Sequence, residues 1–178
     1  MRILATAALA LTAAATPAFA QDEAKPFQGP RAEIVGGWDR VETNNAGASG
    51  FTYGGALGYD LQRGKAVFGV EGEVTGSTAK ETDAGVTVKA GRDLYAGVRA
   101  GYVVIPNTLL YVKGGYTNAR VIGETANVRA ADNLDGFRLG AGVERQFGRF
   151  YGKVEYRYSN YSQDVERHQV LAGLGVRF

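Results

Sequence analysis

The 178-residue chain has no cysteine, a single histidine, one methionine and four prolines. The absence of cysteine excludes a disulfide framework and thiolate chemistry, and one histidine removes most schemes for a metal site. Beyond the N-terminus, no apolar run reaches the roughly 20 residues that a transmembrane helix needs. An excess of one charge is also missing, because 20 Lys and Arg stand against 18 Asp and Glu. This balance gives no reason to expect a nucleic-acid partner.

Glycine and aromatic residues, by contrast, are plentiful. The chain has 26 glycines, 10 tyrosines and 8 phenylalanines. The glycine share is roughly double the usual value of about 7%. This composition favours many closely packed strands over the helical core of a typical enzyme.

The first 20 residues have the pattern of a cleaved export signal. Arg2 supplies a positive start, Ile3–Ala15 (ILATAALALTAAA) is apolar, and Ala18–Ala20 (AFA) is a small-x-small cleavage site. We therefore predict a signal peptide over residues 1–20 and export of the protein. Loss of Arg2 leaves a mature charge of 19 − 18 = +1.

Residues 21–29 (QDEAKPFQG) are polar and show no periodicity. We expect them to form a mobile N-terminal tail. A single domain then follows over residues 30–178.

Within this domain, eight segments alternate between apolar and polar residues with a period of two, which predicts strands. These segments are 31–42, 51–61, 66–76, 91–104, 109–121, 135–147, 150–161 and 166–178. Short connections at 62–65, 105–108 and 148–149 alternate with mostly longer, more polar ones at 43–50, 77–90, 122–134 and 162–165. The pattern predicts an all-β fold, an eight-stranded antiparallel up-and-down barrel with both termini at the short-turn end.

The apolar face of these strands is expected to point outward, into a membrane. The charged face is dense in glycine, which weakens a water-facing strand but leaves room for long side chains in a crowded interior. The aromatic residues of the apolar face also gather in two bands on either side of an aliphatic belt, as on a bilayer-facing surface. These girdles include Trp38, Tyr53, Tyr59, Tyr102, Tyr116, Phe147, Phe150, Tyr156 and Tyr158. The alternative is a soluble barrel or sandwich with this face inward.

The opposite face carries charges of both signs, which predicts an ion network inside the barrel. Its members are Glu33, Glu71, Glu73, Arg99, Lys113, Arg138, Glu144, Lys153, Glu155, Arg157 and Arg177, with Asp39, Asp60 and Asp93 on the same face. A barrel of about eight strands is only wide enough for side chains to fill, whereas porins with water channels have about 16–18 strands. We expect these residues to close the lumen, and a narrow porin-like channel for small solutes or ions is the alternative.

Three stretches resemble a known family: DGFRLGAGVE (Asp135–Glu144), KVEYRYSNY (Lys153–Tyr161) and VLAGLGVRF (Val170–Phe178). The sequence is similar to the small eight-stranded outer-membrane β-barrels of Gram-negative bacteria, and among them to the opacity-like, porin-family proteins of alphaproteobacteria. The end of the chain resembles the signal that the barrel-insertion machinery recognises, carried by Val170, Ala172, Leu174, Val176 and Phe178.

The resemblance implies an outer-membrane location, periplasmic termini and surface loops. It also implies contact with outer-membrane lipid and lipopolysaccharide, and with the barrel-assembly machinery during insertion. Members of the family are assigned to envelope integrity, adhesion or small-solute passage, so a structural or surface-interaction role is expected. The short loops identify no host or surface ligand.

An enzymatic barrel is a further alternative, and the only histidine is its one candidate for catalysis. Lipid-modifying barrels combine a histidine with a serine and an acid. Here His168 has Ser159, Ser162, Asp164 and Glu166 nearby, in a spacing that matches no such motif. We therefore expect no catalytic residue, no metal site and no cofactor.

Overall fold

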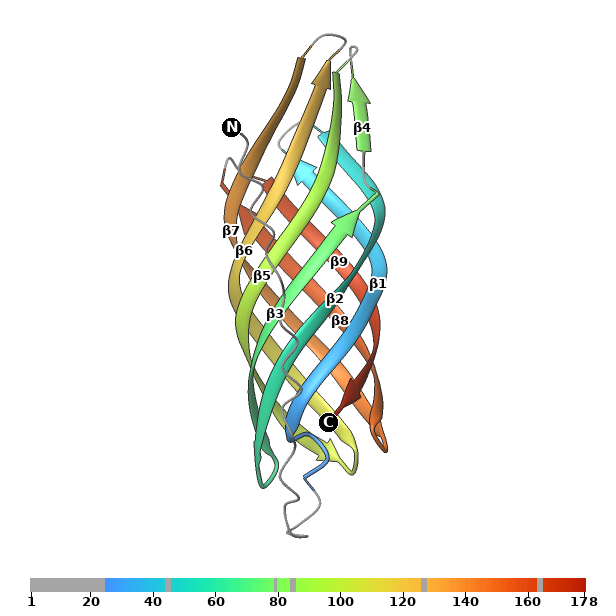
Figure 1. Cartoon of the computed structure of the whole chain (residues 1–178), viewed down its shortest axis with the longest axis vertical. Helices are drawn as coiled ribbons and strands as arrows, with labels where there is room; N and C mark the ends of the chain where they lie inside the picture. The colour runs from blue at the N-terminus through green and yellow to red at the C-terminus, as the bar shows by residue number, and fades with distance from the viewer. Residues whose placement is uncertain (1–24, 44–45, 79, 84–85, 126–127, 163–164) are drawn as a thin grey trace, which may run out of the picture.

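The computed structural model describes residues 25–43, 46–78, 80–83, 86–125, 128–162 and 165–178, which form an elongated barrel of tilted strands (Figure 1). No helix among these residues is long and apolar enough to cross a membrane. The strands are β1 (Gly29–Thr43), β2 (Ala46–Arg63), β3 (Ala66–Ser77), β4 (Lys80–Asp83), β5 (Val86–Ile105), β6 (Thr108–Thr125), β7 (Val128–Phe147), β8 (Phe150–Tyr161) and β9 (Val165–Arg177).

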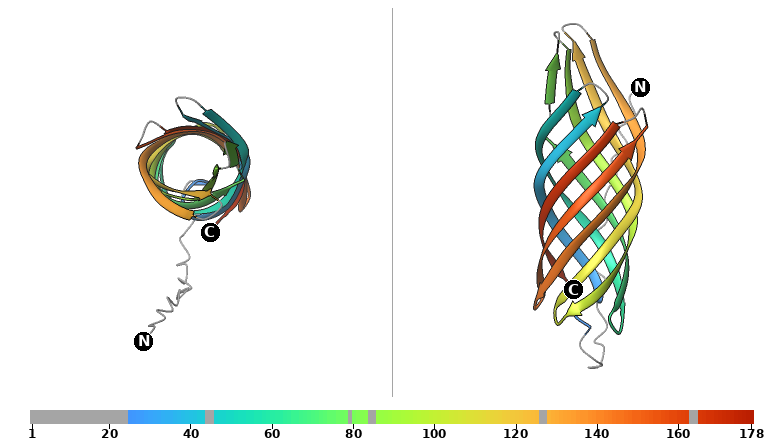
Figure 2. Two further views of the ribbon diagram at one scale, coloured as in Figure 1. Left: turned by 90° about the horizontal axis from the view of Figure 1, so that it is seen from above. Right: turned by 180° about the vertical axis from the view of Figure 1, so that it is seen from behind.

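Eight of the nine strands form a closed antiparallel barrel. The sheet order is β3-β2-β1-β9-β8-β7-β6-β5-β4, and an additional pairing of β3 with β5 closes the ring. Viewed along the barrel axis, the strands form a continuous wall (Figure 2). Because each barrel strand pairs with its neighbour in the chain and β1 pairs with β9, the topology is up-and-down. The predicted fold class is therefore confirmed.

Three tight turns join the strands at one end of the barrel, here called the turn end. Each contains a residue in the left-handed backbone region: Gly64 with φ 56°, Asn107 with φ 62° and Gly148 with φ 63°. Glycine and asparagine adopt this conformation at little cost, so these residues favour tight hairpins. The carboxamides of Gln62 and Gln146 reinforce two of the turns by donating to the carbonyls of Gly64 and Gly148, each at 2.9 Å.

At the opposite end, here called the loop end, the strands continue further than the sequence predicted. The predicted connections 77–90 and 122–134 lie largely in strand: β6 and β7 pair as far as Thr125 with Val128. At this end, the strands β5, β6 and β7 continue past the end of β8. Together with β4, they project above the rest of the barrel (Figure 1). Backbone pairing extends these hairpins, but their sequences lack the alternation of apolar residues. The prediction relied on that alternation and therefore ended the strands too early.

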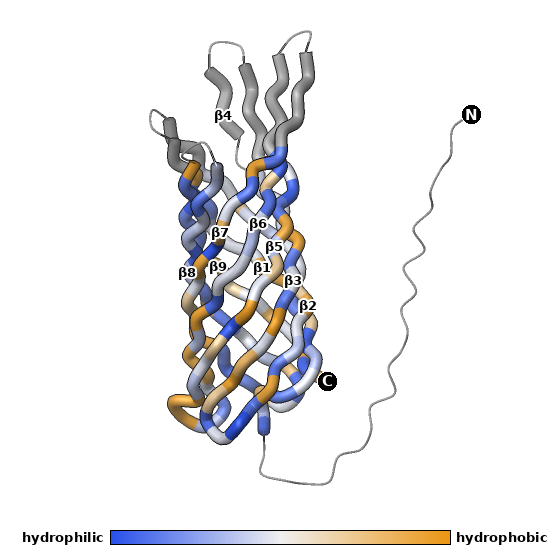
Figure 3. Tube along the Cα trace, turned by 90° about the vertical axis from the view of Figure 1, so that its left-hand side faces the viewer, coloured by the Kyte–Doolittle hydropathy of each residue, from blue (hydrophilic) through white to orange (hydrophobic). Residues whose placement is uncertain are grey.

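Side-chain facing follows the period of two. Exposed apolar residues such as Leu57, Val112 and Leu174 (69, 59 and 68% exposed) lie on the outside. The neighbouring residues in the chain point inward and are mostly polar or small. Hydrophobic and hydrophilic residues alternate along the trace in Figure 3 accordingly. The barrel thus has an apolar exterior and a polar interior, the reverse of a soluble protein.

The N-terminal segment closes part of the turn end. Residues 21–29 were expected to form a mobile tail, but Lys25–Gln28 make a turn and Phe27 is fully buried. Phe27 belongs to a small apolar cluster that also contains Val67 and Leu109. Its backbone N–H donates to Gln62 Oε1 at 3.0 Å, so the turn is fixed by polar as well as apolar contacts. The predicted signal peptide, residues 1–20, lies outside the described residues.

Candidate functional site: the charged barrel interior

The interior of the barrel holds a large set of buried ions. All eleven side chains predicted for the network point inward, each at most 5% exposed: Glu33, Glu71, Glu73, Arg99, Lys113, Arg138, Glu144, Lys153, Glu155, Arg157 and Arg177. Asp39, Asp60 and Asp93 are buried with them. The sequence analysis missed two further cations, Arg31 and Arg167. The buried charges of the described residues are then eight carboxylates and eight cations, so the interior is neutral overall.

The turn-end part of the network is organised by Asp60 and Glu144. Asp60 accepts hydrogen bonds from Arg99 Nε at 2.8 Å and from Arg177 Nη1 at 2.6 Å. Glu144 accepts from the same two arginines, at 2.9 Å from Arg99 Nη1 and 2.7 Å from Arg177 Nη2. Arg31 Nε lies 3.2 Å from Asp60 and joins this cluster to the middle of the barrel.

The middle of the network contains the two buried lysines. Arg31 also pairs with Glu71, which accepts from Lys113 Nζ at 2.5 Å. Lys113 Nζ lies 2.9 Å from Glu155, and Lys153 Nζ lies 3.2 Å from the other oxygen of the same carboxylate. Glu155 therefore bridges two cations that would repel each other if it were absent.

Arg157 and Arg138 carry the network toward the loop end. Arg157 donates to both oxygens of Glu73, each at 2.5 Å, and also pairs with Glu155. Arg138 Nη1 lies 3.2 Å from Glu73, and its Nη2 pairs with Asp93. The planar guanidinium fork suits this bidentate pairing with carboxylates.

At the loop end, Arg167 joins the last two carboxylates. It lies 3.0 Å from Asp93, and its Nε and Nη2 donate to the two oxygens of Asp39 at 2.7 and 2.5 Å. Asp93 also accepts from the hydroxyls of Thr117 at 2.6 Å and Tyr161 at 2.8 Å. Ion pairs are therefore continuous from Arg177 at the turn end to Asp39 near the loop end.

Interior tyrosines fit between the ions because glycines face them. Tyr111 on β6 is paired in register with Gly142 on β7, and Tyr151 on β8 with Gly175 on β9. A Cβ atom on Gly142 would lie 2.7 Å from the Tyr111 hydroxyl, and one on Gly175 would lie 2.5 Å from the Tyr151 hydroxyl. Any other residue at these two positions would displace the ring.

The hydroxyls of these tyrosines belong to the network. Tyr111 donates to Glu155 at 2.6 Å, and Tyr151 donates to Glu33 at 2.7 Å. Glu33 also accepts from Lys153 Nζ at 2.6 Å. The tyrosines thus fill space in the lumen and satisfy carboxylate oxygens at the same time.

The two missed cations could have been found from the same periodicity. Arg31 precedes Glu33 by two residues, and Arg167 precedes Gln169 and Leu171, which are both buried, on the inward face of β9. Both lie close to the ends of predicted segments, where facing is hardest to assign from a pattern alone.

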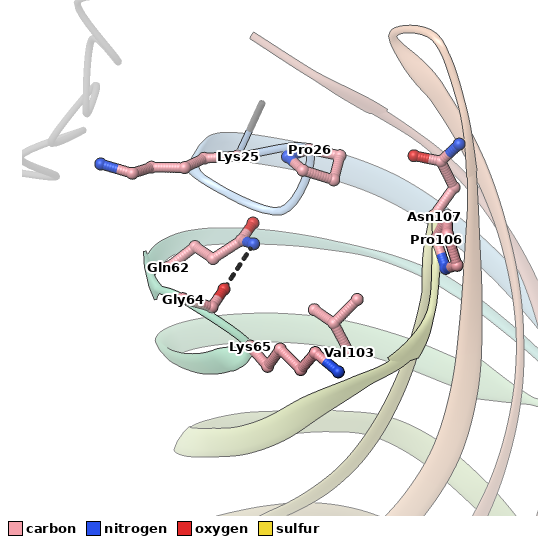
Figure 4. A pocket seen from close by; sticks show the side chains of 8 residues that line it. All are labelled: Lys25, Pro26, Gln62, Gly64, Lys65, Val103, Pro106 and Asn107. Carbon is pink, nitrogen blue, oxygen red and sulfur yellow. Dashed lines mark hydrogen bonds between the residues drawn. The ribbon is translucent and has the colours of Figure 1, made fainter. Parts of the chain in front are cut away.

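The turn-end mouth contains a hollow of about 380 Å³ beside the N-terminal turn (Figure 4). Lys25 and Pro26 line one side, and the rest of the lining includes Lys65 of the β2–β3 turn, Val103 of β5 and Asn107 of the β5–β6 turn. Arg177 Nη1 donates to the carbonyl of Phe27 at 2.9 Å, so this mouth is tied to the end of the ion network.

The residues predicted to form the aromatic girdles lie on the outward face. Trp38, Tyr53, Tyr59, Tyr102, Tyr116, Phe147, Phe150 and Tyr156 are each 47–68% exposed, and Tyr158 is partly exposed. The residues predicted as the insertion signal also lie on this face of β9 or just after it: Val170, Ala172, Leu174, Val176 and Phe178.

His168 lies on the outward face too, and it is not arranged for catalysis with Ser159. Its Nδ1 is 2.7 Å from the Tyr156 hydroxyl, whereas Ser159 is buried inside and accepts a hydrogen bond from Arg138. Asp164 lies outside the described residues. Within the described part of the chain, no cluster of three or more His, Asp or Glu side chains is arranged to hold a metal ion.

Comparison with known proteins assigns this architecture to a family. The sequence model of the family described as "Outer membrane protein beta-barrel domain" matches residues 6–178. The chain belongs to this family. Its outer-membrane location, expected from the resemblance, is thereby confirmed.

Curated relatives of this family member are outer-membrane proteins of Brucella and Rhizobium species. The 25 kDa outer-membrane immunogenic protein of Brucella ovis is 27% identical over 146 residues, which are 80% of this chain and 72% of that protein. The protein of the same name from Brucella canis is 31% identical, over 79% of this chain and 66% of its own length. The 22 kDa outer membrane protein of Rhizobium leguminosarum bv. viciae is 28% identical, over 81% of this chain and 76% of its own length.

Solved structures confirm the fold of this family member. Neisserial surface protein A superposes with a TM-score of 0.67 at 14% identity, covering 85% of this chain and 98% of that one. Ail, the attachment invasion locus protein of Yersinia pestis, gives a TM-score of 0.62 at 17% identity, covering 85% and 99%. At this level of identity the likeness concerns the fold alone.

Proposed function

We propose that this outer-membrane barrel has a structural or surface-interaction role in the cell envelope and that its interior ions close the lumen. The observation that carries the proposal is the continuous, neutral chain of ion pairs from Arg177 to Asp39. Eight carboxylates meet eight cations among the described buried residues, so no excess charge remains inside to select a permeating ion.

The energetics of buried ions support closure. An isolated ion in a narrow, poorly hydrated space is costly, so such ions persist only when they are paired and hydrogen-bonded. A hydrated channel would screen these groups and would not require close contacts. Here the two oxygens of Glu73 each lie 2.5 Å from Arg157, and Glu71 lies 2.5 Å from Lys113.

The orientation in the membrane follows from the two ends of the barrel. The turn end, with both ends of the domain, would face the periplasm, and the loop end would face the cell exterior. The aromatic residues would then lie at the two membrane interfaces, in contact with phospholipid on one side and lipopolysaccharide on the other. Phe178 and the apolar residues before it on β9 would serve the assembly machinery during insertion.

The loop end is where a surface interaction would take place. The projecting parts of β5, β6 and β7, with β4, form a raised wall on one side of the barrel mouth (Figure 1). The Ail barrel has been crystallised in complex with the heparin analogue sucrose octasulfate, which shows a ligand on a barrel of this fold. For the present chain, the raised wall is the proposed region of contact.

Planar-bilayer conductance of the refolded protein tests the closed lumen. We expect no steady current under conditions in which a porin conducts. Protease treatment of whole cells, which should cleave the loop end but not the turn end, tests the orientation in parallel. A steady, ion-selective current from the wild type would instead support the narrow porin-like channel and reject closure.

A further inference from the structure

The outer wall of the barrel carries a groove of about 840 Å³ across β1, β8 and β9, between β2 and β7. Its floor consists of small outward-facing residues, Gly36, Gly152 and Ala172. These lie next to one another in the sheet: Gly36 is paired with Ala172, and Ala172 is also paired with Val154, two residues from Gly152. Because Ile34 and Leu174, Phe51 and Tyr53 rise around these three small residues, they leave a depression.

Large apolar side chains form the two walls of the groove. Phe51 and Tyr53 of β2 stand on one side, and the Phe51 ring leans over the floor, since a Cβ on Gly36 would lie 3.1 Å from its Cζ. Val143 and Phe147 of β7 stand on the other side. The lining is therefore almost entirely apolar, which suits a hydrocarbon chain.

One cation lies at the end of the groove. Arg145 points outward from β7 and is exposed, with its guanidinium 5.7 Å from the Phe147 ring centroid and its Nη1 3.5 Å from the Thr108 hydroxyl. No carboxylate among the described residues pairs with it, in contrast to every interior arginine. Its charge is free to bind an anion at the level of the turn-end aromatic residues.

The groove runs in the direction of a lipid acyl chain. Arg145 lies close to the turn end of β7, whereas the floor residue Gly36 lies at the middle of β1. The groove thus begins at the turn-end interface and rises toward the middle of the bilayer. An acyl chain of a lipid in the turn-end leaflet runs the same way from its headgroup.

From this geometry we infer a specific site for one glycerophospholipid, with its phosphate on Arg145 and an acyl chain along the floor of Gly152, Ala172 and Gly36. Guanidinium groups bind phosphate oxygens through charge-assisted hydrogen bonds, and the low polarity of the surroundings strengthens them. This site differs from the general lipid-contacting surface of a membrane protein, because it combines a shaped apolar groove with an unpaired cation at the depth of the lipid phosphate.

Native mass spectrometry of the detergent-purified barrel, titrated with phosphatidylglycerol, tests this site. We expect one tightly retained lipid on the wild type. Arg145→Gln should weaken its binding by about tenfold or more, the loss expected for one hydrogen bond to a charged group. Gly152→Leu should fill the floor and abolish retention. A Cβ at this position meets only Leu174 Cδ2, at 3.8 Å, so the substitution is compatible with folding.

Two matched variants serve as controls. Arg63→Gln removes another exposed arginine, at the turn end of β2 and outside the groove lining. Gly72→Leu adds a side chain to another outward glycine, on β3, whose Cβ would meet only Tyr95 O at 3.9 Å. Both should retain the lipid as the wild type does. Equal lipid retention by all five proteins would overturn the site. The site would also be overturned if the wild type formed a barrel dimer without bound lipid and Gly152→Leu dissociated that dimer.

Discussion

Arg157 of β8 binds Glu73 of β3 across the full width of the barrel, with both of its terminal nitrogens 2.5 Å from the two carboxylate oxygens. The two strands are diametrically opposed, because three strands separate them in either direction: β2, β1 and β9 one way, and β5, β6 and β7 the other. A pair this short joins opposite walls of the barrel, which supports the proposed closure of the lumen. It also connects strands that share no backbone hydrogen bonds.

Glu73→Ala is expected to destabilise the barrel by about 3–5 kcal/mol, because it leaves Arg157 and Arg138 partly unpaired in the interior. Urea unfolding in detergent measures the change. Asp135→Ala, which removes an exposed carboxylate from the outer surface of β7, should change the unfolding free energy far less. An unchanged midpoint for Glu73→Ala would mean that the interior is hydrated and that the pairs contribute little.

The facing of the strands predicts different costs for charges at different depths. Val112→Arg places a cation in the aliphatic belt and should cost about 2–4 kcal/mol, whereas Leu110→Arg, nearer the turn-end interface, should cost about 0–1 kcal/mol. Spin labels at Val112 and Lys113 check the assignment independently. Lipid-soluble oxygen should quench the label at Val112 only, and quenching at Lys113 would reverse the facing.

Period-two alternation was enough to predict the barrel and the inward or outward direction of most side chains. The reason is physical: lipid on one side and a crowded polar lumen on the other impose opposite demands on successive residues. Glu155 and Tyr156 therefore reveal their facing from the sequence alone. The demand applies only within the bilayer, which is why the extension of β6 and β7 past Val121 and Leu134 gave no such signal.

The individual partners in the ion network and the burial of Phe27 could not be predicted in the same way. Alternation shows that Arg157 and Glu73 point inward, but not that they meet, because partners across the lumen depend on strand number and stagger. Phe27 was missed for another reason. It lies in a polar stretch without periodicity, and its burial results from contacts with Val67 and Leu109, which are distant in the sequence.

The end of the chain leads to a prediction about assembly. Phe178 is 57% exposed on the outer surface, and its backbone N–H donates to the Pro30 carbonyl at 2.9 Å, where β9 meets β1. Phe178→Ala should lower the amount of protein in the outer membrane and leave protease-sensitive material in the periplasm. Phe150→Ala removes another exposed turn-end aromatic residue, without changing the terminal one, and should insert normally. Equal membrane levels for both variants would contradict a terminal signal.

We expect the N-terminal turn and the ion network to make separable contributions to the proposed closure of the lumen. Phe27 is fully buried at the turn-end mouth, so Phe27→Ala should destabilise the barrel by about 3–5 kcal/mol, the usual cost of removing a buried phenylalanine ring. The mid-barrel pairs remain intact in this variant, and its bilayer conductance should stay at the wild-type baseline.

Glu155→Ala removes the bridge between Lys113 and Lys153, and in combination with Phe27→Ala it should produce a leak. Gln28→Ala, at an exposed position in the same turn, should affect neither stability nor conductance. If Phe27→Ala alone conducts steadily, the N-terminal turn and not the ion network is the barrier in the lumen.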